Sequence, residues 1–283
     1  MEEPFAADLI AAHCGQIDAL LHSIQGWDSG GTCIVDELYV LRFLLADPVN
    51  AERNLKACLE WRQRNRDILI EASKGHVPFE EGIQKNVKKG VCGWLGGQYL
   101  ISVVRAGHGN PSGIMRDLTY EQALDHLLFH NEYLFTLVDQ QTRRTGRLCK
   151  VITVLDLQGF SMLKFDRRFA KASGESTHLT TIYYPQLTKT VVLINLPATF
   201  RILHSFAMRF ASRATLDAQK LCPARTSKGS AVKCPFLSKF GDSGAAAVPS
   251  FLGGTFPTPN SLRLNEDEME VDSSSELVDT IMS

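Results

Sequence analysis

The sequence lacks the features that would place the protein outside the cell or inside a membrane. Its seven cysteines are odd in number, widely spaced and include no C-x-x-C pair, which argues against a disulfide framework. Residues 1–4 are acidic and have neither the basic nor the apolar segment of a secretory signal peptide. No apolar run approaches the roughly 20 residues that a bilayer crossing needs. We therefore expect a cytoplasmic protein with reduced thiols.

The sequence also has little net charge, formally -1 at pH 7. A nucleic-acid partner is not expected, because such proteins are usually basic. The charge is unevenly distributed, since the stretch from Pro257 onward has seven acidic residues against Arg263 alone, and the preceding part carries about +5. A mildly basic body suits transient contact with an anionic membrane surface, at about 1 kcal/mol for each well-placed Lys or Arg.

Apolar spacing divides the chain into a helical part and a part with alternating elements. Helical spacing predicts helices over 5–24, 36–46, 50–66 and 79–89, a small bundle that fills the first 90 residues. Strands are expected over 99–104, 149–155 and 190–196, and helices over 119–143, 165–182 and 198–213. This alternation predicts an α/β body. The acidic, serine-rich stretch from 257 lacks apolar periodicity, which predicts a disordered tail.

Polar residues mark the expected helix ends. Asp36, Asn50 and Thr119 each precede a helical segment and can cap it. Arg62 falls among the basic residues of the third helix, which we expect to face solvent mostly. Gly107–Gly113 is rich in Gly, Asn and Pro and predicts a surface turn. The stretch 221–247 should contain the last strand of the sheet but shows no clear pattern.

Four short motifs follow one another over residues 36–254. They are DELYVLRFL with CLEWR (36–44 and 58–62), VLDLQG (154–159), YPQ leading to VLINLPATF (184–186 and 192–200), and VPSFLGG (248–254). Each motif is weak alone, but the four in this order resemble the CRAL-TRIO family. That family has the fold of the yeast phosphatidylinositol transfer protein and of the retinaldehyde and tocopherol carriers.

The resemblance implies a fold in which an N-terminal helical bundle precedes a mixed sheet flanked by helices. The sheet would form the floor of an apolar lipid cavity, and helix 198–213 would close the cavity as a gate. We accordingly expect an N-terminal helical region over 1–90, a lipid-binding domain over 91–256 and a tail over 257–283. Asp156, Gly159 and Asn195 are interpreted as structural residues at the strand ends, because an acid can satisfy loop amides and glycine accepts unusual backbone angles.

The resemblance also implies which residues contact lipid. Alternation along the strand puts Val151, Thr153 and Leu155 on one face, with Ile101 and Val103 beside them if the strand register allows it. Thr153 matches a position that contacts lipid phosphate. The full expected set is Ile101, Val103, His130, Val151, Thr153, Leu155, Gln186, Phe200, Leu203, Phe206, Phe210 and Lys220.

Departures from the family pattern bear on the choice of lipid. In the yeast protein, a basic pair helps to bind inositol phosphate, and Asp47 lies in the segment that corresponds to this pair. Gln186 replaces the glutamate of the family's YPE motif. An anionic headgroup needs converging cations, and only Lys220 and Arg209 remain to supply them. We therefore do not expect strong phosphatidylinositol specificity. We expect the ligand to be another phospholipid, a sterol-like or isoprenoid molecule, or a fatty acyl compound.

Three rival motifs are interpreted as coincidental or structural. The sequence Gly241-Asp242-Ser243-Gly244 imitates a serine-protease segment without the rest of a triad. His126 and His130 are four residues apart on a helix but lack the glutamate and third ligand of a zinc site. The 107–113 stretch lacks the P-loop pattern. We expect no catalytic residue, metal or cofactor.

Two functions remain open from the sequence. The favoured one is binding, and possible transfer, of one lipid by a non-enzymatic carrier that associates transiently with membranes. The alternative is an interaction or signalling module that recruits protein partners to membranes and uses its cavity only for regulation. Stoichiometric lipid that purifies with the protein would separate the two.

Overall fold

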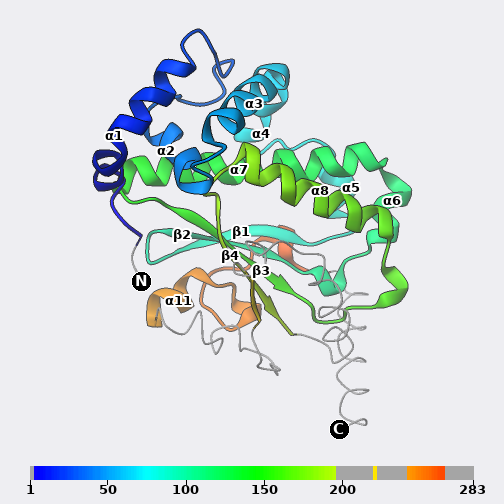
Figure 1. Ribbon diagram of the computed structural model, residues 1–283. Coiled ribbons are helices and arrows are strands. Elements are labelled where there is room, and N and C mark those ends of the chain that lie inside the picture. The colour runs from blue at the N-terminus through cyan, green and yellow to red at the C-terminus, as the bar shows by residue number, and fades with distance from the viewer. Residues whose placement is uncertain (1–2, 196–218, 222–240, 265–283) are drawn as a thin grey trace. The chain divides into compact units, whose positions relative to one another are not determined.

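A computed structural model describes residues 3–195, 219–221 and 241–264 (Figure 1). These residues belong to two compact units that interleave along the chain. The first, which we call the helical unit, comprises Met1–Glu80, Met115–Lys150 and Arg167–Leu187. The second, the sheet unit, comprises Glu81–Ile114, Val151–Asp166 and Thr188–Ser283. None of the described helices has both the length and the apolar character that crossing a bilayer requires.

The helical unit contains most of the helices that apolar spacing predicts. Its helices are α1 (Ala6–Ser23), α2 (Glu37–Ala46), α3 (Ala51–Arg64), α4 (Arg66–Ser73), α7 (Tyr120–Thr145) and α8 (Arg167–Tyr183). All but α4 lie within a few residues of the predicted ranges. Helix α4 was not predicted as a separate element. The break between α3 and α4 falls at Asn65, whose backbone amide and side chain both donate to the Trp61 carbonyl, at 3.1 and 2.8 Å.

The predicted caps are confirmed at two helices and wrong at the third. The Asp36 carboxylate accepts from the Tyr39 amide at 3.0 Å, and Thr119 begins α7 with a reciprocal capping box to Gln122. Asn50 precedes α3 but does not cap it. Its backbone, at φ -107° and ψ 10°, is not in the extended conformation typical of an N-cap, and its side-chain amide donates to the Asp47 carboxylate at 2.8 Å.

The expectation that Arg62 faces solvent is wrong. Its guanidinium is fully buried and donates to both carboxylate oxygens of Glu132, at 2.6 and 3.0 Å. It donates further to the Thr32 hydroxyl at 2.8 Å. A buried charge requires such pairing, because an isolated ion in the interior is costly. The nearby Glu132 charge outweighs burial and raises the pKa of Arg62 above its ordinary value.

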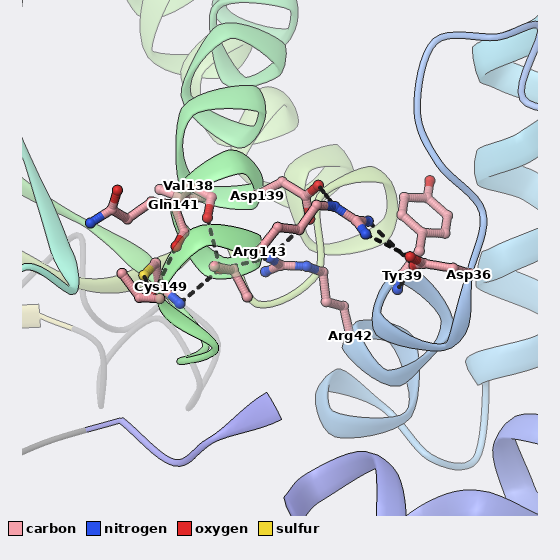
Figure 2. A network of polar contacts seen from close by, with 10 residues as sticks. Asp36, Tyr39, Arg42, Val138, Asp139, Gln141, Arg143 and Cys149 are labelled. Carbon is pink, nitrogen blue, oxygen red and sulfur yellow. Dashed lines mark hydrogen bonds and ion pairs between the residues drawn. The ribbon is translucent and has the colours of Figure 1, made fainter. Parts of the chain in front are cut away.

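A polar network joins α2 to α7 in the helical unit (Figure 2). Arg143 donates to Asp36 at 2.6 Å and to Asp139 at 2.7 Å, and Asp139 also pairs with the buried Arg42 at 3.3 Å. Arg42 reaches Thr142 as well, whose hydroxyl accepts from the Cys149 amide at 3.0 Å. Partial burial of Asp36 opposes its ionisation, but the Arg143 hydrogen bond prevails and lowers the pKa of that carboxyl.

The sheet unit is built on a five-stranded mixed sheet with strand order β1-β2-β3-β4-β5. The strands are β1 (Lys89–Leu95), β2 (Tyr99–Val104), β3 (Lys150–Asp156), β4 (Thr188–Ile194) and β5 (Gln219–Leu221). Strands β1 and β2 are antiparallel, whereas β3, β4 and β5 are parallel. The predicted α/β fold class with a mixed sheet is confirmed. The last strand, β5, overlaps the stretch where it was expected, 221–247, only at Leu221.

Two segments at the start of the sheet unit differ from the prediction. The expected helix over 79–89 is only one turn, α5 (Glu80–Gln84), and β1 begins at Lys89. The glycine-rich turn contains the beginning of a helix, α6 (Pro111–Asp117), with Pro111 in its first position. Proline is tolerated there because the first amides of a helix have no intrahelical partner. The strand β1 was missed because glycines interrupt its apolar residues.

The predicted tail begins too early. Asn260–Leu262 forms a short 3-10 turn and Leu262 is fully buried in the sheet-unit core. The Leu262 carbonyl accepts from Arg105 at 3.4 Å, and Gly90 lies close enough that an added Cβ would meet Ser261. These contacts hold 257–264 in place despite the lack of apolar periodicity. Residues 265–283 lie outside the described residues.

Candidate functional site

One face of the mixed sheet, which we call the packed face, is part of a closed apolar core. It is formed by β2, β3 and β4 through the side chains of Ile101, Val103, Ile152, Val154, Val192 and Ile194. Val248, Leu252 and Leu262 from the later part of the chain pack against these side chains, and so does helix α11 (Gly241–Ala247) through Ala247. Gly93 permits this close approach, since a Cβ there would lie 2.8 Å from the Ala247 backbone.

The opposite face of β3 and β4, which we call the Thr153 face, is less completely covered. The parallel register pairs Thr153 with Val191 and Leu155 with Leu193, so these four side chains form one contiguous patch. Thr153, Leu155 and Val191 are half-buried, whereas Leu193 is buried. The patch is an apolar surface with a single hydroxyl group, which suits contact with hydrocarbon beside one polar anchor.

The expected placement of Ile101 and Val103 is wrong. Both are fully buried in the packed face, together with Ile152 and Val154. Neighbouring residues of a strand point to opposite faces, so Ile101 and Val103 lie on the side away from Thr153 and Leu155. Val151, two residues before Thr153, points to the same face as Thr153 and is buried. A role of Ile101 and Val103 in lipid contact would require access through the packed core.

The ends of β3 and β4 are joined by the polar residues that the sequence predicts there. Oδ1 of the buried Asp156 accepts from the Gln158 amide at 3.1 Å and from the Asn195 side chain at 2.8 Å. Arg105 Nε lies 3.9 Å from the other carboxylate oxygen. Gly159 has φ +74°, where an L side chain is strained, and Asn195 has φ +53°. The structural interpretation of these residues is consistent with this geometry.

The other expected lipid-contact residues belong to the helical unit or lack described side chains. His130 lies on α7 and Gln186 follows α8, so both belong to the helical unit. Backbone pairing aligns Lys220 with Val192, and the side chain of Lys220 is outside the description. Phe200, Leu203, Phe206 and Phe210, with the expected gate helix, lie outside the described residues. Their roles stay predictions.

Sequence reasoning missed two members of the Thr153 face, Val191 and Leu193. The strand over 190–196 was expected, but its near-continuous apolar residues hide which side chains share a face. Pairing with β3 resolves the ambiguity, because a residue directly opposite Thr153 in a parallel pair points the same way. The information that assigns Val191 and Leu193 to the Thr153 face is therefore the register between β3 and β4, which a single sequence does not contain.

The histidine pair on α7 is arranged as packed side chains. The His126 and His130 rings are nearly parallel with centroids 6.2 Å apart. His126 is fully buried, with Nδ1 2.7 Å from the Pro78 carbonyl and Nε2 3.7 Å from the Glu80 carboxylate. Over the described ranges, no group of three or more His, Cys, Asp or Glu side chains is placed to hold a metal ion.

A family model agrees with the fold. The model of the CRAL/TRIO domain matches residues 85–228, just over half of the chain. These residues include all five strands and the Asp156–Asn195 junction. The chain belongs to the CRAL/TRIO domain family.

Two individual proteins illustrate the range of similarity. The phosphatidylinositol/phosphatidylcholine transfer protein SFH13 of Arabidopsis thaliana is 23% identical over 189 residues, which cover 62% of this chain and 29% of that protein. The chain therefore spans less than a third of the length of this relative. The crystal structure of Sfh5 matches with a TM-score of 0.59 at 13% identity, and covers 96% of this chain and 97% of the other. That match shows the fold.

Proposed function

We propose that this protein binds one lipid on the Thr153 face and passes it between or at membranes, without catalysing a reaction. The observation that carries the proposal is the difference between the two faces of one sheet. The packed face is closed by the chain itself, whereas Leu155 and Val191 keep accessible apolar surface opposite it. Membership of the CRAL/TRIO domain family supports the same proposal, as does the similarity to SFH13, a phosphatidylinositol/phosphatidylcholine transfer protein.

The composition of the patch bears on the kind of lipid. Thr153 is its one polar side chain, so binding energy would come mainly from hydrocarbon. Burial of an acyl chain contributes about 0.8 kcal/mol per CH₂ group, which is enough for affinity without converging cations. We infer a phospholipid or another lipid held by its apolar part, with weak selection for an inositol phosphate headgroup. A cytoplasmic protein that meets membranes transiently fits this role.

Native mass spectrometry of the purified protein, followed by organic extraction, tests the proposal. A single lipid at near-equal stoichiometry is the expected result, and the extract identifies its headgroup. Exchange is then measured by incubation of the loaded protein with vesicles that contain labelled phosphatidylcholine. A protein that is isolated empty and takes up no lipid from such vesicles would contradict the proposal and favour the alternative, a module that recruits protein partners.

A further inference from the structure

An exposed apolar turn follows β3 in the sheet unit. Leu163 is 94% exposed, Met162 is 50% exposed and Phe165 is 42% exposed. Among the described residues, nine large apolar side chains are exposed, and three of them fall within the four consecutive positions 162–165. The other six are scattered between Phe5 and Phe79. We call residues 160–165 the apolar turn.

The apolar turn is built with its backbone groups satisfied. The Ser161 hydroxyl accepts from the Leu163 amide at 3.3 Å, and the Phe165 amide donates to the Met162 carbonyl at 3.2 Å. From α6, the Ser112 hydroxyl lies 3.2 Å from the Lys164 carbonyl and can donate to it. The backbone of the turn is therefore held within the sheet unit while its large side chains point to solvent. Such exposure costs free energy unless a partner covers it.

The size and charge of the apolar turn indicate the partner. Four residues offer far less area than the roughly 1,200 Å² of a stable protein–protein interface. Lys164 is the one charged residue between Gly159 and Phe165, and it is exposed. Large apolar side chains around a cation match the boundary of a bilayer, where the apolar groups meet acyl chains and the cation meets lipid phosphates.

We propose that Met162, Leu163 and Phe165 insert into the headgroup region of an anionic membrane while Lys164 contacts its phosphates. The inference rests on the proposed function, which requires a meeting with a membrane, and it names the surface that meets it. Acidic headgroups are expected to attract Lys164, and salt weakens this attraction. Insertion of the apolar side chains provides the part of the binding that salt does not remove.

Vesicle flotation with the full chain tests the inference. Wild-type protein is expected to float with phosphatidylcholine vesicles that contain phosphatidylserine, and more weakly with phosphatidylcholine alone. Leu163→Glu removes an apolar contact and adds a negative charge that the phosphatidylserine headgroups repel. The vesicle partition coefficient should therefore fall about tenfold or more. Lys164→Ala should reduce it about fivefold, and only with phosphatidylserine at low salt.

The matched control is Val49→Glu, because Val49 is an apolar residue with 91% exposure in the helical unit. It should leave flotation unchanged. Equal flotation of wild type and Leu163→Glu, or no flotation of the wild type with either vesicle, would overturn the inference. Bound lipid is measured in each variant by native mass spectrometry. Retained lipid with lost flotation supports the inference, whereas an empty wild type that still floats through the turn refutes only the proposed function.

Discussion

The two faces of the mixed sheet carry similar side chains but differ in how completely the chain covers them. Ile152 and Val154 on the packed face are fully buried, because the segment with Val248 and Leu262 packs over them. On the Thr153 face, Leu155 and Val191 are only half-buried, although Leu155 lies on the same strand as Ile152 and Val154. The residue types along a strand therefore do not decide how completely each face is buried; the segment that packs on that face does.

This difference in burial predicts that the packed face contributes to folding stability and the Thr153 face to ligand affinity. Apolar area that the chain buries permanently contributes to the free energy of folding. Apolar area that stays accessible contributes little until a ligand covers it, and can then contribute to binding. Substitutions on the two faces should consequently have different effects: those on the packed face should unfold the protein, and those on the Thr153 face should change what it binds.

The largest effect is expected from a cavity in the packed face. Ile152→Ala should lower the free energy of unfolding by about 2–5 kcal/mol, because it removes buried methyl groups and leaves a cavity. Leu155→Ala, three positions along on the opposite face, is the control and should cost only about 1 kcal/mol. Urea denaturation followed by circular dichroism measures both. Equal losses would show that the Thr153 face is as much a core as the packed face.

A smaller loss of stability is expected at the junction of β3 and β4. Asp156→Ala removes the acceptor of the Asn195 and Gln158 hydrogen bonds and should cost about 1–3 kcal/mol, since buried donors lose their partner. Asp156→Asn keeps one acceptor oxygen and should cost less. The same denaturation experiment distinguishes the two. A stability of Asp156→Ala equal to wild type would contradict a structural role.

The smallest effect on stability, and a clear effect of ligand, is expected for a thiol placed on the Thr153 face. Thr153→Cys should react with iodoacetamide in delipidated protein and be protected after loading with lipid. Cys92 in the packed face is an internal reference, because burial raises the pKa of its thiol to about 12 and keeps it unreactive. Peptide mapping by mass spectrometry follows each thiol. Equal labelling with and without lipid would place the ligand elsewhere.

Local patterns in the sequence predicted the elements that depend on local interactions. The apolar spacing of α1, α2, α3, α7 and α8 and the caps at Asp36 and Thr119 act within one or two turns. The family was identified from the order of the four motifs, because these motifs are spread over most of the chain. Pro111 was assigned to a surface turn although it begins α6, because a proline is unfavourable inside a helix but tolerated in its first turn.

What the sequence did not predict depends on residues far apart in the chain. Arg62 appeared exposed because its partner Glu132 comes 70 residues later. Ile101 and Val103 were assigned to the wrong face because alternation defines two faces of each strand but not which faces of two strands coincide. Leu262 was assigned to a disordered tail because its segment lacks apolar periodicity, but the segment is ordered by packing of Leu262 into the sheet-unit core.

The most direct test of the binding face is native mass spectrometry of Thr153→Phe beside wild type and Val49→Glu. A phenyl ring among Leu155, Val191 and Leu193 fills space that a lipid would occupy on the half-buried face. We predict that Thr153→Phe stays folded by circular dichroism and loses most of its bound lipid, while Val49→Glu keeps it. A folded Thr153→Phe protein that retains lipid at wild-type stoichiometry would contradict the assignment of the ligand to the Thr153 face.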